Sequence, residues 1–137
     1  MQKLQAYHWI VSGSDFYELH EVFETMYQKG RKDIDDLAER IAAIGCIPLL
    51  TLRSYTQTSK IQEARVTKNS KEMMEGILND LRSLSKQGRK VHSYAMLLSD
   101  IPTAHLLADF MLRIGKEEWK VRSWLNKTHI MPSSLDN

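Results

Sequence analysis

Apolar residues recur every three or four positions along most of the chain, which is the period of an α-helix. Residues 1–11 form a short amphipathic segment. Three longer helical patterns follow, at about 16–44, at about 68–98, and from Pro102 to about Lys127. The apolar positions of the first long pattern are Phe16, Leu19, Phe23, Met26, Tyr27, Ile34, Leu37, Ala38, Ile41 and Ile44. Because no stretch alternates apolar and polar residues in the manner of a β-strand, the pattern predicts an all-α chain.

Turn and capping residues indicate where these helices begin and end. Asp15 followed by Glu18 has the spacing of a capping box, which predicts a helix start near Phe16, after the turn Ser12-Gly13-Ser14. Gly45 is a plausible C-terminal cap, and Pro102 suits the first turn of the last helix. Residues 46–67 have weaker periodicity and could hold one short helix.

The order of helix pair, long crossover and helix pair is the plan of a ferritin-like four-helix bundle, here a single domain over 1–137. The first helix is short for this plan, since only Met1 to Tyr7 precede His8. We therefore expect either that residues upstream of Met1 are missing from this sequence or that the bundle is open at that corner.

Composition and charge bear on the partners and the cellular compartment of the protein. The formal net charge of +2 requires neither nucleic acid nor an anionic membrane as partner. Cys46 is the only cysteine, so no disulfide can form within the chain, and a reducing, cytoplasmic compartment is expected. No apolar run approaches the length of a membrane span, so we expect no membrane association of that kind.

Candidate metal ligands lie on one flank of the helix at 16–44. They form two pairs with i,i+4 spacing, His20 with Glu24 and Asp35 with Glu39. The pairs are separated by about 16 Å along the helix axis, so one straight helix cannot bring both to one ion. An antiparallel copy of this helix, related by a twofold axis, could do so, which would give two identical sites per dimer. A solvated helix face is the alternative interpretation of the same residues.

An ordered set of motifs carries a family resemblance that covers nearly the whole chain. The stretch "YHWIVSGSDFYELHEVFETMY" is followed by "DIDDLAERIAAIG" and Pro48, then by "SYTQTSKIQEA" and "GKEEWKVRSWL". This set strongly resembles the Dps family of dodecameric mini-ferritins. The chain contains no Glu-x-x-His, the motif that di-iron bundles use to hold iron within one subunit.

The resemblance implies a ferroxidase centre shared across a dimer interface. Its ligands would be His8, His20 and Glu24 from one chain, with Asp35 and Glu39 from the twofold mate. Glu24 stands where many relatives carry Asp. Trp9 would lie beside the site, where it could accept an oxidising equivalent or simply pack in the core.

The function that the resemblance implies is oxidation of Fe(II), preferentially by hydrogen peroxide, and storage of ferric mineral in a homo-dodecameric shell built from twofold dimers. Iron is then the metal, no organic cofactor is expected, and the benefit is protection against oxidative stress. The alternative is a nucleoid-binding or structural Dps-like shell whose ferroxidase activity is weak or vestigial.

The resemblance also places an iron-entry pore near the start of the last helix. Asp100 and Asp109 occupy that neighbourhood, and His105 stands where relatives often carry another acid. His105 could make the pore pH-sensitive or merely face solvent. We expect weak or no DNA binding, because only Lys3 precedes the first motif, the C-terminal tail ends acidic, and "KQGRK" at 86–90 reads as a solvated helix face.

Overall fold

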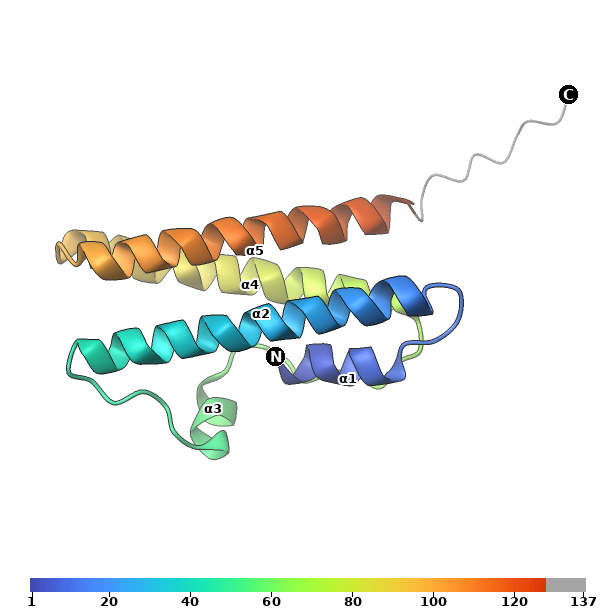
Figure 1. The fold of residues 1–137 in the computed structure, drawn as a ribbon, viewed down its shortest axis with the longest axis horizontal. Coiled ribbons are helices and arrows are strands. Elements are labelled where there is room, and N and C mark those ends of the chain that lie inside the picture. Colours follow the sequence, from blue (N-terminus) through green and yellow to red (C-terminus); the bar gives the residue numbers. More distant parts are fainter. Residues whose placement is uncertain (128–137) are drawn as a thin grey trace, which may run out of the picture.

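The computed structural model describes residues 1–127, and most of these residues lie in helices (Figure 1). The helices are α1 (Gln2–Ile10), α2 (Phe16–Ala43), α3 (Leu52–Thr58), α4 (Ser70–Leu97) and α5 (Ile101–Lys127). No strand occurs among the described residues, so the predicted all-α class is confirmed, and α3 is the short helix expected in the crossover. The tail that begins at Thr128, including His129, lies outside the described residues.

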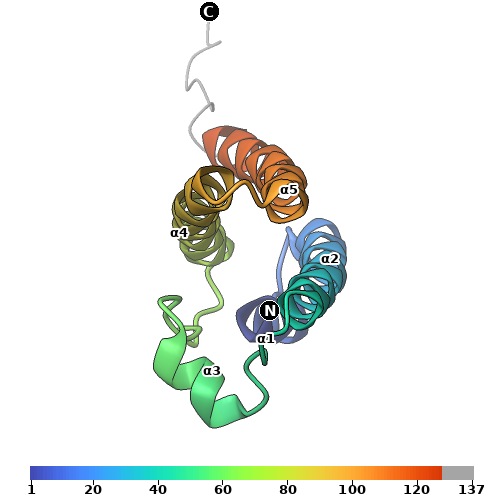
Figure 2. The same cartoon turned by 90° about the vertical axis from the view of Figure 1, so that its left-hand side faces the viewer.

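Two helical hairpins make up the bundle. In the first, α1 and α2 pack side by side around the turn at 11–15, and in the second, α4 and α5 pack around the turn at 98–100 (Figures 1 and 2). The connection at 44–69, which contains α3, crosses from the first hairpin to the second. Within residues 1–127, no helix is both long and apolar enough to cross a membrane.

The two ends of α2 show one incorrect and one correct prediction. Asp15 precedes the helix as expected, but its side chain makes no capping hydrogen bond, so the predicted capping box is wrong. The reason is its backbone, whose φ of -90° and ψ of 5° differ from the extended conformation that N-capping requires. At the other end, Gly45 has a φ of +83°, and the amides of Gly45 and Cys46 donate to the carbonyls of Ala42 and Ile41. This is a Schellman cap, as the glycine predicted.

Local capping also shapes α3 and α4. Thr51 and Ser54 form a reciprocal capping box that begins α3. The Asn69 side chain accepts hydrogen bonds from the first amides of α4. The helix ends in a second Schellman pattern, in which Ser99 takes the left-handed position with a φ of 56°. A serine there is strained in comparison with glycine.

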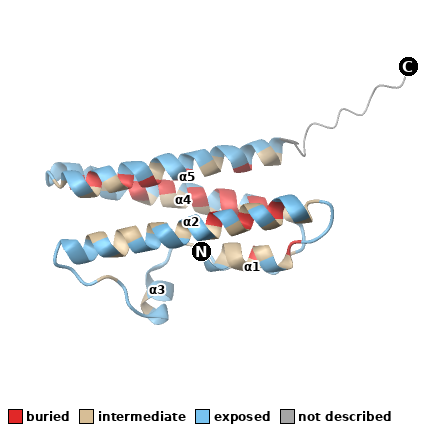
Figure 3. Cartoon of the chain, in the orientation of Figure 1, coloured by how far each residue is buried: buried red, intermediate tan, exposed pale blue. Residues whose placement is uncertain are grey.

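Buried apolar side chains form one main cluster, made by α1, the first half of α2, α4 and α5, and further buried residues continue along α4 and α5 to the turn between them (Figure 3). The cluster consists of Tyr7, Val11, Leu19, Phe23, Met26, Met73, Met74, Ile77, Leu78, Leu81, Phe110, Ile114 and Val121. The end near the turn between α4 and α5 lacks the cover of α1, which has 9 residues against 28 in α2. Ile34, Ile44 and Tyr94 are accordingly exposed there. The bundle formed by these residues is therefore open at that corner.

Ion pairs join the two hairpins along the seam between α2 and α5. Lys29 pairs with Glu117 at 2.9 Å, and Asp33 pairs with Arg113 farther along α2. Arg40, near the end of α2, donates to the carboxylate of Asp100 and to the hydroxyl of Thr103, at 2.7 Å in each case. The α2–α5 seam therefore combines electrostatic contacts with the apolar core at one end.

Glycine has a packing role where α4 meets α5. A Cβ atom built on Gly88 would lie 3.0 Å from Cγ of Met111, which is closer than ordinary van der Waals contact. The absence of a side chain at this position lets the two helices approach each other. Gly88 looks like a weak point in the helical pattern of the sequence, but here it is the residue that the helix contact requires.

Candidate metal centre

His8 and His20 meet where the first hairpin closes. His8 lies in the last turn of α1 and His20 in the second turn of α2, and the turn at 11–15 folds one helix back on the other. The two imidazole rings stack with their centroids 3.8 Å apart and their planes inclined by 22°. The structure thus brings together two residues that are twelve positions apart in the sequence.

Reciprocal hydrogen bonds tie each imidazole to the main chain of the other histidine. Nδ1 of His8 lies 2.9 Å from the main-chain oxygen of His20, and Nδ1 of His20 lies 2.9 Å from the main-chain oxygen of His8. Because a carbonyl oxygen only accepts, each Nδ1 must carry the hydrogen and donate it. In a neutral ring with this hydrogen bond, Nε2 carries the lone pair, which is the arrangement in which histidine binds a metal.

Candidate carboxylates lie at increasing distance from this pair along α2. Glu24 is one turn beyond His20, is half-buried, and accepts a hydrogen bond of 3.1 Å from Nε2 of Gln28. Asp35 and Glu39 are exposed and lie about 16 Å farther along the same helix. Within residues 1–127, no three or more His, Cys, Asp or Glu side chains come together in a way that could hold a metal ion. One chain therefore brings the two histidines together, whereas Glu24 lies one turn farther along α2, and Asp35 and Glu39 lie farther still.

The aromatic environment of the histidines differs from the expectation for Trp9. The Trp9 side chain follows His8 in sequence and is 67% exposed on the single chain, so it is not packed in the core of that chain. The rings that contact the histidines belong to Tyr27, 5.6 Å from His8 between centroids, and to Phe16, 4.9 Å from His20. Helical spacing could have suggested Phe16, which precedes His20 by four positions, whereas the contact of Tyr27 with His8 joins two different helices.

The three candidate pore residues lie in the first turns of α5 and just before it. Asp100 precedes the helix, and its carboxylate accepts from the hydroxyl and the amide of Thr103. These two hydrogen bonds, followed by the charge of Arg40, hold the pKa of Asp100 below its usual range. His105 and Asp109 are both exposed, and their side chains are 3.6 Å apart. Asp100 thus has a capping role in this chain that the sequence pattern did not indicate.

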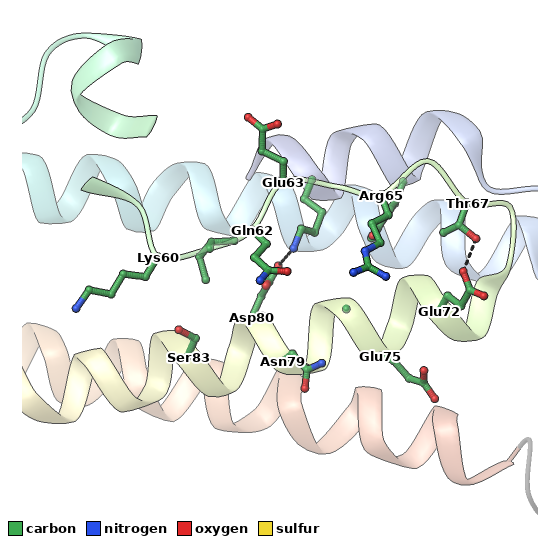
Figure 4. A pocket seen from close by; sticks show the side chains of 14 residues that line it. Lys60, Gln62, Glu63, Arg65, Thr67, Glu72, Glu75, Asn79, Asp80 and Ser83 are labelled. Carbon is green, nitrogen blue, oxygen red and sulfur yellow. Dashed lines mark hydrogen bonds and ion pairs between the residues drawn. The ribbon is translucent and has the colours of Figure 1, made fainter. Parts of the chain in front are cut away.

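A pocket of about 500 Å³ lies away from the candidate ligands. It is bounded by α1, by α4 and by the connection that follows α3 (Figure 4). Its lining includes Lys3, whose ammonium group pairs with Asp80 at 2.6 Å and whose side chain is only 10% exposed. Tyr7 is buried on the same side, and burial raises the pKa of its hydroxyl. None of the five candidate metal ligands lines this pocket. Lys3 is therefore engaged within the chain rather than free at its surface.

Comparisons with known proteins agree with this architecture. The model of the ferritin-like domain family matches residues 1–131. DNA protection during starvation protein 2 of Bacillus anthracis is 36% identical over 125 residues, which is 91% of this chain and 86% of that protein. The crystal structure of Dps from Staphylococcus aureus superposes with a TM-score of 0.88 at 31% identity, covering 90% of this chain and 83% of that one.

A second similar structure links the fold to proteins that bind iron through carboxylates. Dps from Vibrio cholerae O1, described as a member of a broad superfamily of ferritin-like diiron-carboxylate proteins, superposes with a TM-score of 0.88. It is 29% identical, and the match covers 90% of this chain and 78% of that one. The helical order, the matched family model and these relatives together show that the chain belongs to the Dps family of ferritin-like proteins.

Proposed function

We propose that this protein is a ferroxidase and iron-storage protein whose active site is completed by a second copy of the chain. His8, His20 and Glu24 of one subunit would bind Fe(II) together with Asp35 and Glu39 of its twofold mate. The observation that carries this proposal is the separation of the two ligand groups by about 16 Å on one straight helix. No three candidate ligands gather within residues 1–127 of a single chain.

The chemistry of these residues suits iron as the substrate. Imidazole nitrogen and carboxylate oxygen are ligands that a divalent iron ion accepts. Hydrogen peroxide is the proposed oxidant: two Fe(II) ions supply two electrons, two protons are taken up, and two water molecules form. Because both electrons reach one peroxide molecule, no hydroxyl radical is released, which would protect the cell against oxidative damage. The ferric product would be stored inside a homo-dodecameric shell.

A mixture of two single variants tests the shared site. His20→Ala removes an imidazole from one half-site, and Glu39→Ala removes a carboxylate from the other. In a mixed dimer one site lacks both ligands while the other is intact. Random co-refolding should therefore restore about a quarter of the wild-type sites, since half of the dimers are mixed and each has one intact site. Mixed shells that assemble correctly but recover no activity would contradict the shared site.

Two further measurements test the oxidant and the assembly. Iron oxidation followed by absorbance should be much faster with hydrogen peroxide than with dioxygen, and the yield of hydroxyl radical should fall when the protein is present. Equal rates with the two oxidants would contradict the peroxide preference. Light scattering under native conditions should give the mass of a dodecamer. A measured mass equal to that of a monomer would contradict both the shell and the shared site.

We also propose that DNA binding is weak and that the protein acts in the cytoplasm. The amino-terminal lysine that could contact phosphates, Lys3, pairs with Asp80 instead. Iron would enter near the start of α5, where His105 and Asp109 are exposed and Asp100 is partly neutralised by Arg40. A gel-shift titration at physiological salt should show no stable complex with duplex DNA, and a tight complex would contradict this part of the proposal.

A further inference from the structure

Four aromatic rings form a continuous column at the histidine pair. Phe16, His20 and Tyr27 come from α2, and His8 comes from α1. The centroid separations along the column are 4.9 Å from Phe16 to His20, 3.8 Å from His20 to His8, and 5.6 Å from His8 to Tyr27. The two imidazoles therefore lie inside the column, and the two hydrocarbon rings lie at its ends.

The hydrogen bonds at Nδ1 do not by themselves fix the imidazole planes. Each bond holds one ring atom near a carbonyl oxygen, and the ring can still tilt about that contact. A tilt moves Nε2, the atom that would face a metal, because it lies on the opposite side of the ring. Two aromatic neighbours contact each imidazole and can restrict this tilt. His20 has Phe16 and His8 as neighbours, and His8 has His20 and Tyr27.

Tyr27 is the ring outside the histidine pair that contacts His8, and it belongs to the longer of the two helices. His8 stands in the last turn of a helix of only 9 residues, whereas Tyr27 lies well inside the 28-residue helix α2. The ring of Tyr27 meets that of His8 nearly at right angles, at 77°, which is a favourable edge-on geometry for aromatic pairs. Trp9, the residue next to His8, is largely exposed.

We propose that Tyr27 is a positioning residue that holds the imidazole of His8 in its metal-binding orientation. It does so with its ring, and its hydroxyl is not required. The effect on metal affinity rests on the function proposed above, whereas the effect on the His8 ring concerns the metal-free protein and stands apart from it. Tyr27→Phe keeps the ring edge and removes the hydroxyl, and Tyr27→Leu keeps an apolar side chain and removes the ring.

Crystal structures of the metal-free wild type, Tyr27→Phe and Tyr27→Leu test the orientation directly. Wild type and Tyr27→Phe should show one His8 conformer with Nδ1 close to the His20 carbonyl. Tyr27→Leu should show a tilted or multiple His8 ring, while His20 stays in place against Phe16. An unchanged His8 in Tyr27→Leu would overturn the proposal, as would a displaced His8 in Tyr27→Phe.

Calorimetric titration with Zn²⁺ tests the consequence for metal binding. Tyr27→Phe should bind within about twofold of wild type, and Tyr27→Leu should bind about threefold to tenfold more weakly, as expected for loss of one aromatic pair. Tyr94→Leu, which changes a half-exposed tyrosine on α4, is the matched control and should bind as wild type does. Equal weakening in Tyr27→Phe and Tyr27→Leu would overturn the role of the ring.

The two measurements separate this inference from the proposed function. If wild-type protein bound no Zn²⁺, the metal site would be wrong, and the crystal structures would still decide whether Tyr27 holds His8. If wild type bound Zn²⁺ and Tyr27→Leu bound it equally well with His8 in place, only the role of Tyr27 would be refuted. Size-exclusion chromatography of each variant confirms that the assemblies being compared are the same.

Discussion

Replacing Phe23 with alanine should strongly destabilise the protein. Phe23 has no exposed surface, and its ring lies 5.8 Å from that of Tyr7 on α1. It belongs to the main apolar cluster, three residues after His20. The substitution leaves a cavity between α1 and α2 and removes one of the contacts that hold the short α1 helix in place.

The magnitude follows from the burial of the side chain. A fully buried phenylalanine truncated to alanine costs about 3–5 kcal/mol, from lost apolar burial plus the cavity that remains. Against a typical total of about 5–15 kcal/mol for a folded domain, this is a large fraction of the stability. Tyr17→Ala is the matched control on the same helix, since Tyr17 is 86% exposed and its loss should change stability by less than about 0.5 kcal/mol.

Urea unfolding followed by far-ultraviolet circular dichroism, at one fixed subunit concentration, measures both variants. Phe23→Ala should unfold at a clearly lower urea concentration than wild type, and Tyr17→Ala should not. If the two variants had the same urea midpoint, the burial of Phe23 in the apolar core would be contradicted. The packing of α1 on α2, on which the histidine pair depends, would then need another explanation.

Three further predictions concern backbone conformation, pH and helix contact. Ser99→Gly should raise the free energy of unfolding by about 0.5–1 kcal/mol, because Ser99 has a φ of 56°, and a lower urea midpoint would contradict the assigned strain. The pKa of Asp100 is lowered in the folded state, so its charged form adds stability above the unfolded value of 3.8, and this stability is lost as the pH falls below that value and through the folded pKa. Thr103→Val removes the hydroxyl bond that lowers this pKa, so the loss of stability below about pH 4 should be less steep in thermal melts. Gly115→Ala, with open space around it, should raise the free energy of unfolding by about 0.5–1 kcal/mol in the same assay, and Gly88→Ala should gain less than Gly115→Ala because its Cβ would lie 3.0 Å from Cγ of Met111, which must shift.

The sequence predicts the helices well because their signals are local. The apolar period placed α2 within one residue of its observed ends, and Gly45 correctly marked its cap. Asp15 shows the limit of such reasoning, since a capping side chain works only with an extended backbone, and the tight turn at 11–15 sets that backbone otherwise. Residue type and spacing alone do not report this conformation.

The candidate site could be predicted in part. The spacing of His20 and Glu24 on one helix is visible in the sequence, but the stacking of His8 on His20 depends on how α1 docks against α2. The contact of Tyr27 with His8 has the same origin, because it joins residues of different helices. Asp100 was predicted from its position near the last helix, and its bonds to Arg40 and Thr103 become evident only when α2 lies against α5.

The two hairpins differ in the residues that they contribute to the proposed metal site. All five candidate ligands, together with Phe16 and Tyr27, belong to the α1–α2 hairpin, so residues 8–39 contain the whole proposed ligand set. The α4–α5 hairpin contributes the other wall of the core and the surface around Asp100 and His105. Chimeras that exchange the second hairpin between relatives would therefore change the proposed entry residues while keeping every proposed metal ligand. The exchange requires that the ion pairs along the α2–α5 seam be transferred as a set.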